Sequence, residues 1–173
     1  LMMVVGIFLV VGIDVAMNSN IGNFLEQKIG INAETAKYGK TMYFFAKMIG
    51  TFAGALLLTK IAPRKFLISS SILAIVALTA LAFTSNKISA WIIIFIVSLG
   101  VSNIFPLIFS ITVGKMPDRS NEISGLMMMA ISGGAIIPFL VGLAMDSWLP
   151  AGIFVLVACA VYILFIGLIS REK

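Results

Sequence analysis

Long apolar runs separated by short polar gaps dominate the sequence. Six runs are about 20 residues long, which is the length at which an α-helix crosses the hydrocarbon core of a bilayer. Such runs must be helical, because open strands would leave backbone groups unpaired in lipid. The expected spans are 3–25, 38–58, 66–84, 90–113, 123–145 and 151–169. The sequence therefore predicts an all-α polytopic membrane protein with six transmembrane helices in one bundle over residues 1–173.

Composition excludes several other classes of protein. Of the 173 residues, 61% are hydrophobic and 11% are charged, whereas a soluble domain has about 25% charged residues. The net charge of +5 is spread over the polar gaps and not along one stripe, so we expect no nucleic-acid partner. The chain has one cysteine and no histidine, which excludes the usual zinc sites and His-based catalysis. We predict no enzyme activity, no catalytic residue, no metal and no cofactor.

The basic residues of the gaps are divided unevenly between the two sides of the membrane. One side collects seven basic residues and the other collects four. The seven are Lys60, Arg64, Lys65, Lys115, Arg119, Arg171 and Lys173, and the four are Lys28, Lys37, Lys40 and Lys87. Because cytoplasmic loops carry an excess of Lys and Arg, we expect both termini in the cytoplasm. The expected location is the cell inner or plasma membrane, with the chain crossing the lipid bilayer several times.

The six spans also divide into two sets of three with similar residues at corresponding places. Span 3–25 contains Gly-Ile-Asp at 12–14, and span 90–113 contains Gly-Val-Ser-Asn at 100–103. An odd number of spans in each set inverts the second set relative to the first. Two inverted three-helix repeats build each half of the twelve-span transporters, and we predict this arrangement.

Three stretches carry a resemblance to a known family. Residues 102–110 read Ser-Asn-Ile-Phe-Pro-Leu-Ile-Phe-Ser, and residues 124–138 read Ser-Gly-Leu-Met-Met-Met-Ala-Ile-Ser-Gly-Gly-Ala-Ile-Ile-Pro. The turn at 62–65 reads Ala-Pro-Arg-Lys. In these stretches the chain resembles the C-terminal half of a major facilitator superfamily transporter. Within that superfamily it is most similar to the fucose–proton symporter and glucose/galactose transporter group.

The resemblance implies a function and a partner. The function is secondary active transport of a small solute, a monosaccharide coupled to protons, by alternating access. The partner is an N-terminal six-helix half of the same transporter, where the acidic residues tied to proton coupling are expected. The chain starts inside an apolar run with no n-region or cleavage site, so we expect a piece of a longer protein and no signal peptide.

Two ionisable residues lie deep within the predicted spans. An ionisable group at the bilayer centre costs about 2.5–3.5 kcal/mol unless it is paired or faces water. Asp14 lies about 16 Å and Lys47 about 19 Å from the cytoplasmic ends of neighbouring antiparallel spans. We expect the two residues to pair or to face a shared aqueous cavity that binds substrate. The alternative is a structural ion pair with no substrate contact.

Polar and aromatic neighbours extend this predicted substrate site. Asn18 is at i+4 from Asp14 and so shares its helix face. Asn103 is the expected sugar contact on the fourth span, because an amide both donates and accepts hydrogen bonds. Phe105 could stack on a sugar ring. Hydrogen bonding between helices for the amides and packing against Phe109 for the ring are the alternatives.

Two prolines mark predicted helix breaks in the fourth and fifth spans. Pro106 and Pro138 lack an N–H and so free the carbonyls of Ser102 and Gly134. At membrane depth, freed carbonyls are tolerated where neighbours or cavity water satisfy them. We therefore expect the fourth span to line a cavity. The nearby pair Gly50 and Gly54 is interpreted as a helix-packing surface.

Three cations form a tight turn between the second and third spans. Lys60, Arg64 and Lys65 act either as an orientation signal alone or as a cytoplasmic gate that latches onto the missing half.

Two other functions remain open from the sequence. One is a major facilitator transporter of another solute, such as a drug or an organic anion. The other is a membrane scaffold or sensor that transports nothing.

Overall fold

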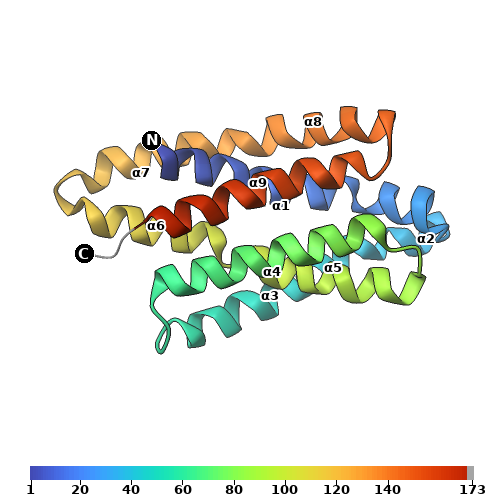
Figure 1. The fold of residues 1–173 in the computed structure, drawn as a ribbon, viewed down its shortest axis with the longest axis horizontal. Coiled ribbons are helices and arrows are strands. Elements are labelled where there is room, and N and C mark those ends of the chain that lie inside the picture. The colour runs from blue at the N-terminus through green and yellow to red at the C-terminus, as the bar shows by residue number, and fades with distance from the viewer. Residues whose placement is uncertain (171–173) are drawn as a thin grey trace.

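A computed structural model describes residues 1–170 of the chain, and all its regular elements over this range are helical. Figure 1 shows them as a bundle of long helices that run roughly along one axis. In chain order the elements are α1 (Met2–Ile29), α2 (Ala33–Ala36), α3 (Tyr38–Leu57), α4 (Pro63–Phe83), α5 (Lys87–Val101), α6 (Ile104–Lys115), η1 (Pro117–Arg119), α7 (Ser120–Met129), η2 (Ala130–Ser132), α8 (Gly133–Ser147) and α9 (Ala151–Ile169).

Local sequence signals set several helix ends. α1 ends at Gly30, which adopts the left-handed conformation with φ 67° and donates to the carbonyl of Glu26. Asn32 caps α2 by accepting from the N–H of Glu34 at 3.0 Å. Asn86 does the same for α5, accepting from the N–H of Ile88 at 2.9 Å. Pro63 begins α4, where its missing N–H leaves no intrahelical bond unmade.

Five helical segments are long and apolar enough to cross a membrane, where the sequence predicted six. They are 2–29, 63–83, 87–115, 117–147 and 151–169. The predicted second span forms a helix, α3, but it is not among the five. It carries Lys40 and Lys47, and these lower its hydropathy. The first span is also longer than predicted, since it continues through the polar residues 26–28 to the cap at Gly30.

Two of the five segments are interrupted near their middle. The segment 87–115 divides into α5 and α6 at Ser102 and Asn103. Pro106 lies in the first turn of α6, so the break absorbs its missing N–H. The segment 117–147 tightens into the 3₁₀ turn η2 at 130–132. The predicted break at Pro138 is not found: this proline lies inside the continuous helix α8, as is tolerated in membrane helices whose neighbours satisfy the freed backbone group.

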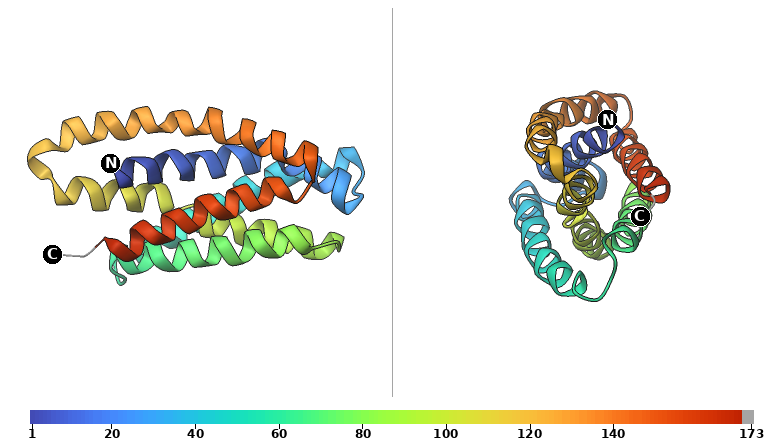
Figure 2. Two further views of the ribbon diagram at one scale, coloured as in Figure 1. Left: turned by 45° about the horizontal axis from the view of Figure 1, so that its top comes forward. Right: turned by 90° about the vertical axis from the view of Figure 1, so that its left-hand side faces the viewer.

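The arrangement of the helices leaves one face of α1 uncovered by α8 and α9. α1 packs against α8, α9 and α6, while α4 lies between α5 and α9. α3 packs on α5 and on α1, and within residues 1–170 it makes no contact with α7 or α8. Figure 2 shows α3 and the α7–α8 segment as separate edges of the bundle. Between these edges, α1, α5 and α6 supply the floor of the site described below.

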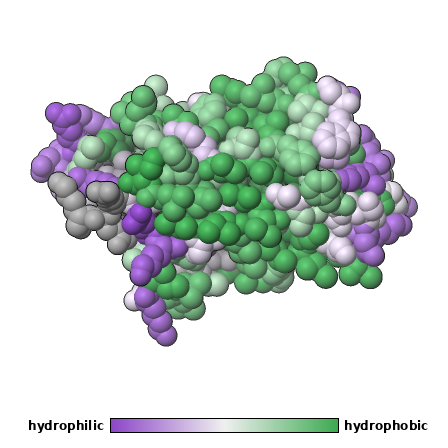
Figure 3. Space-filling view, viewed as in Figure 1, coloured by the Kyte–Doolittle hydropathy of each residue, from purple (hydrophilic) through white to green (hydrophobic). Residues whose placement is uncertain are grey.

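The surface has the polarity of a membrane protein. Figure 3 shows apolar residues over the middle of the bundle and hydrophilic residues gathered at its two ends. Several large apolar side chains on α3 and α8 are more than half exposed, among them Phe52, Leu56, Phe139 and Leu143. An apolar band of this kind matches the hydrocarbon of a bilayer and would be unfavourable in water.

Candidate functional site

An ion pair joins α1 and α3. The Nζ atom of Lys47 lies 2.5 Å from Oδ2 of Asp14. The side chains are 31% and 27% exposed, respectively, so both remain accessible. The structure thus brings together the two deep ionisable residues that the sequence placed at similar depth. Pairing lowers the cost of each charge in a low-dielectric medium.

Tyr43 completes the surroundings of the Asp14 carboxylate. Its hydroxyl donates to Oδ1 of Asp14 at 2.9 Å, so each carboxylate oxygen has its own donor. Tyr43 is fully buried, and its backbone carbonyl accepts from the hydroxyl of Ser98 on α5 at 2.6 Å. This chain of contacts fixes α3 to α1 and α5 and holds the carboxylate in one orientation.

A cavity of about 310 Å³ opens beside this ion pair. This volume is at the lower end of the ~300–1,000 Å³ typical of small-molecule sites. Its walls come from α1, α3, α5 and α6. The lining residues are Val10, Val11, Asp14, Lys47, Thr51, Val101, Ser102, Phe105 and Pro106. The cavity therefore combines one charged pair and two hydroxyls with an apolar wall that includes a phenyl ring.

Asn103 is not a wall residue of this cavity, contrary to the sequence interpretation. Its side chain is 4% exposed and donates to the carbonyl of Gly50 at 2.8 Å and to the hydroxyl of Ser102 at 2.9 Å. Gly50 and Gly54 allow this approach, since a Cβ on Gly54 would overlap the Asn103 amide. Asn103 thus ties the break between α5 and α6 to α3.

The other predicted site residues divide between the cavity and its surroundings. Phe105 lines the cavity and stacks on Phe109, with ring centroids 6.3 Å apart and planes at 16°. Pro106 lines it as well. Asn18 is half-buried on α1 and is not among the lining residues, and the same is true of Pro138 on α8. Asn18 faces the same side of α1 as Asp14, but it lies one helical turn further along and so does not reach the cavity.

The basic turn at the start of α4 is tied to this half of the bundle through one residue. Arg64 donates to the carbonyls of Gly167 at 3.1 Å and Leu168 at 2.6 Å, at the C-terminal end of α9. A cation at this end of a helix is stabilised by the exposed carbonyls. Lys60 and Lys65 are exposed. Arg171 and Lys173, counted above for topology, lie outside the described residues.

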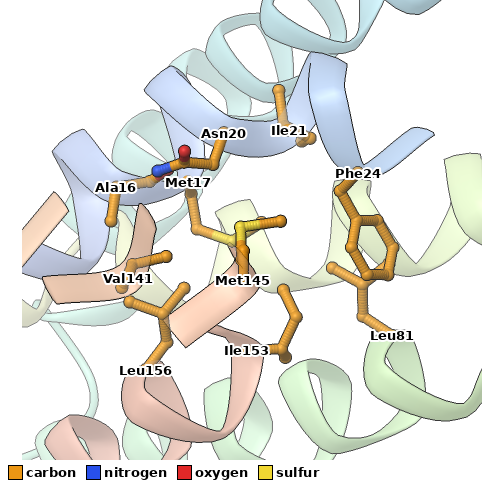
Figure 4. A pocket seen from close by; sticks show the side chains of 10 residues that line it. All are labelled: Ala16, Met17, Asn20, Ile21, Phe24, Leu81, Val141, Met145, Ile153 and Leu156. Atoms are coloured by element: carbon orange, nitrogen blue, oxygen red, sulfur yellow. The ribbon is translucent and has the colours of Figure 1, made fainter. Parts of the chain in front are cut away.

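A second, smaller hollow lies on the other side of α1. Its volume is about 10 Å³, enough for about one water molecule. Figure 4 shows its lining, which is apolar except for Asn20. The Asn20 amide donates to the carbonyl of Ala16 on its own helix at 3.1 Å. This hollow is therefore a packing defect of the core formed by α1, α4, α8 and α9.

Sequence reasoning missed two members of the cavity region, Tyr43 and Thr51. They lie four residues before and four residues after Lys47, so all three share one face of α3. A helical-face analysis of α3 centred on its one deep lysine would have found both. Among the described residues, no group of three or more His, Cys, Asp or Glu side chains could hold a metal ion.

The fold and its apolar band define the class of this protein as a polytopic helical membrane protein with a cavity that contains an ion pair. The family follows from comparison with known proteins: the chain belongs to the Major Facilitator Superfamily, whose family model matches residues 3–173. A glucose/galactose transporter of Brucella abortus biovar 1 is 30% identical over 174 residues, which cover 98% of this chain and 42% of that protein. A candidate glucose/galactose transporter of Helicobacter pylori strain J99 is 32% identical over 169 residues, covering 94% and 41%.

Solved structures agree with this assignment at the level of the fold. The superfamily transporter FucP in its outward conformation superposes with a TM-score of 0.92 at 23% identity, covering 99% of this chain and 42% of FucP. The chain therefore spans about two fifths of the length of the proteins it matches. These relatives are transporters by name and not enzymes.

Proposed function

We propose that this chain forms one half of a secondary transporter for a neutral monosaccharide, which works by alternating access and is coupled to protons. The observation that carries the proposal is the ion pair of Asp14 and Lys47 in the wall of a cavity within an apolar bundle. Charges persist at membrane depth where they serve a wet pathway or a ligand site. The names of the similar proteins, glucose/galactose transporter and fucose:proton symporter, support a sugar and a proton.

The chemistry of the cavity suits a sugar. Asp14 offers carboxylate acceptors and Lys47 offers ammonium donors, while Thr51 and Ser102 carry hydroxyl groups. The ring of Phe105 presents an apolar face of the kind that packs on the C–H face of a pyranose. Because Asp14 already compensates the charge of Lys47, the described residues give the cavity no unpaired cation for an organic anion.

Alternating access requires a second bundle and a defined topology. We place α3 in the membrane as a sixth span, so that α1, α3 and α4 form one repeat and the remaining three spans form its inverted counterpart. An N-terminal six-helix half would close the cavity from the other side, with the two halves rocking about it. This half would supply one wall of the site, where Asp14, Lys47 and Phe105 touch the substrate. Asn18 would lie at the edge of the site.

The remaining assignments follow from this topology. The basic turn of Lys60, Arg64 and Lys65 would lie at the cytoplasmic face, with both termini on that side of the cell inner membrane. Arg64 would hold α4 and α9 together there as one rigid body. Among the described residues, Asp14 is the one carboxylate deep in this half, so a proton site within it would use that residue.

Counterflow in proteoliposomes tests the proposal. The complete transporter containing this chain should exchange labelled glucose, galactose or fucose, and a panel of unlabelled sugars should compete. Competition by a drug or an organic anion, without competition by sugars, would favour the other transporter class. A scaffold or sensor would move no solute. The matched variant Asp14→Asn, at equal expression, should lower exchange, and unchanged exchange would remove Asp14 from the site.

A further inference from the structure

We infer that Asp14 and Lys47 together act as a charge filter. The pair admits neutral hexoses and rejects both hexuronates, which carry a carboxylate, and protonated hexosamines. Neutralising one partner opens the cavity to the solute whose charge replaces it. The inference rests on the proposed function and assigns its substrate charge class.

The geometry places both partners where an entering solute meets them. Asp14 and Lys47 line the same cavity, with 27% and 31% of their side chains exposed. Their charged atoms are 2.5 Å apart, so a solute group that touches one is also close to the other. A solute carboxylate on Lys47 would therefore also face the like charge of Asp14. A solute ammonium on Asp14 would face Lys47 in the same way.

The rest of the cavity wall carries no charge that could change this balance. The other lining residues are Val10, Val11, Thr51, Val101, Ser102, Phe105 and Pro106. Within the described part of the chain the pair is thus the whole charge of the cavity, and its net charge is zero. A neutral solute enters without adding an uncompensated charge, whereas an ionic solute adds one in a low-dielectric site. Rejection by juxtaposed like charge is a common device of specificity.

Tyr43 keeps the filter from rearranging. Its hydroxyl holds Oδ1 of Asp14, so the carboxylate cannot rotate away from Lys47 to make room for a second anion. Tyr43 is fully buried and makes no contact with the cavity, so it acts as a positioning residue. Tyr43→Phe should weaken rejection of hexuronate while leaving both charges in place.

The inference predicts opposite changes for the two single variants. Asp14→Asn leaves Lys47 without its counter-ion, so the ratio of glucuronate to glucose exchange should rise roughly tenfold or more. Lys47→Gln leaves Asp14 alone, so the ratio of protonated glucosamine to glucose exchange should rise by a similar factor. The double variant Asp14→Asn/Lys47→Gln should show neither increase. Glu26→Gln on α1 and Lys40→Gln on α3 are matched controls, because both side chains are exposed and lie outside the cavity wall.

The experiment measures counterflow of glucose, glucuronate and glucosamine for each variant of the complete transporter, with solute-induced thermal stabilisation as a second readout on the same preparations. The filter is supported if the glucuronate ratio rises only in Asp14→Asn and the glucosamine ratio rises only in Lys47→Gln. If the unmodified transporter exchanges glucose but the ratios of the single variants match those of the controls, the filter is overturned and the proposed function stands. If the unmodified transporter neither exchanges nor binds any of the three, and does the same with galactose and fucose, both are overturned. If Asp14→Asn fails to fold, an unchanged glucosamine ratio in Lys47→Gln overturns the filter by itself.

Discussion

α1 separates two hollows of opposite character. On one side, Asp14 lies in a cavity of about 310 Å³ together with Lys47. On the other side, Asn20 borders a hollow of about 10 Å³ that is otherwise apolar. Asn20 follows Asp14 by six residues, which places it about 120° away around the helix, on a different face. Both are polar residues on one membrane helix, yet only the first is part of a network that joins separate helices.

The difference lies in where each side chain finds its partners. Asn20 bonds to the carbonyl of Ala16 one turn earlier, so its polarity is satisfied within α1. Asp14 accepts from two residues of α3 and so depends on a second helix. A polar group satisfied locally can be tolerated in a packed core, whereas an ion pair across helices requires a persistent polar opening or a function. Polarity alone therefore does not identify a site on a membrane helix.

The largest effect is expected from removing one charge of the Asp14–Lys47 pair, on the side of α1 that borders the larger cavity. Lys47→Met would leave the Asp14 carboxylate without its counter-ion, and sugar uptake should fall roughly tenfold or more. Initial uptake rates per surface-expressed molecule measure this. The double variant Asp14→Asn/Lys47→Met should recover part of the loss, because no uncompensated charge remains. Equal uptake by Lys47→Met and the unmodified protein would show that the two sides of α1 do not differ in function.

The side of α1 that packs on α8 should respond to changes in packing. A Cβ on Gly133 would overlap the backbone carbonyl of Phe8, so Gly133→Ala should force α1 and α8 apart. Overpacking of this kind lowers the free energy of unfolding by about 1–3 kcal/mol. Among the described residues, a Cβ on Gly142 of the same helix would meet nothing within 4 Å, so Gly142→Ala is the matched control. Thermal unfolding in detergent measures the stability of both variants. Equal melting temperatures would refute the close contact between α1 and α8 at Gly133.

The break between α5 and α6, beside the larger cavity, should be the next most sensitive position. Asn103→Ala removes the bonds to Gly50 and Ser102 and leaves buried polar groups without a donor. The expected loss of unfolding free energy is about 1–2 kcal/mol. Asn103 holds α3 against the break and is not in the cavity wall. The loss of binding free energy for sugar should therefore be smaller than the loss of unfolding free energy. A fall in affinity as large as that of Lys47→Met would place Asn103 in direct contact with substrate.

A smaller effect is expected at the end of the bundle that holds the basic turn. Arg64→Gln removes a cation from the C-terminal carbonyls of α9, which should lower the stability by about 0.3–1 kcal/mol. Lys65→Gln, next to it and exposed, should leave the melting temperature unchanged. If the two variants melt alike, the contact of Arg64 with α9 does not contribute to stability.

The smallest effect is expected from Asn20. Asn20→Leu removes an amide whose acceptor already takes part in the helix, so stability should change by less than about 0.5 kcal/mol. Sugar uptake should stay at the level of the unmodified protein. A marked loss of uptake would mean that the small hollow shown in Figure 4 belongs to the transport pathway.

Much of the fold follows from hydropathy and length, because a bilayer demands apolar helices of fixed minimum size. The span at 151–169 has the predicted bounds, and the contact of Asp14 with Lys47 follows from a constant rise per residue. α3 does not meet the hydropathy of a span, since its lysines reduce its mean hydropathy while its glycines and Tyr43 are buried. Hydropathy averages over the two faces of a helix and does not record which one is buried.

The assignment of Asn103 could not be made from the sequence. Its neighbours, Pro106 and Ser102, correctly indicated an interruption of the helix, but the direction of the amide depends on another helix. The small surface of Gly50 lets α3 approach until its carbonyl meets Asn103. A contact between residues 53 positions apart is set by tertiary packing, which local spacing does not encode.

Accessibility of single cysteines tests most directly whether the Asp14–Lys47 cavity is the sugar pathway. In the complete transporter with Cys159→Ala and with every cysteine outside this chain replaced, Thr51→Cys places a thiol in the cavity wall and Asn20→Cys places one in the small hollow. The account predicts that a small, neutral and water-soluble methanethiosulfonate modifies the Thr51→Cys protein quickly, that glucose slows the reaction, and that the Asn20→Cys protein stays unmodified. Equal rates at the two positions, with no protection by sugar, would contradict it.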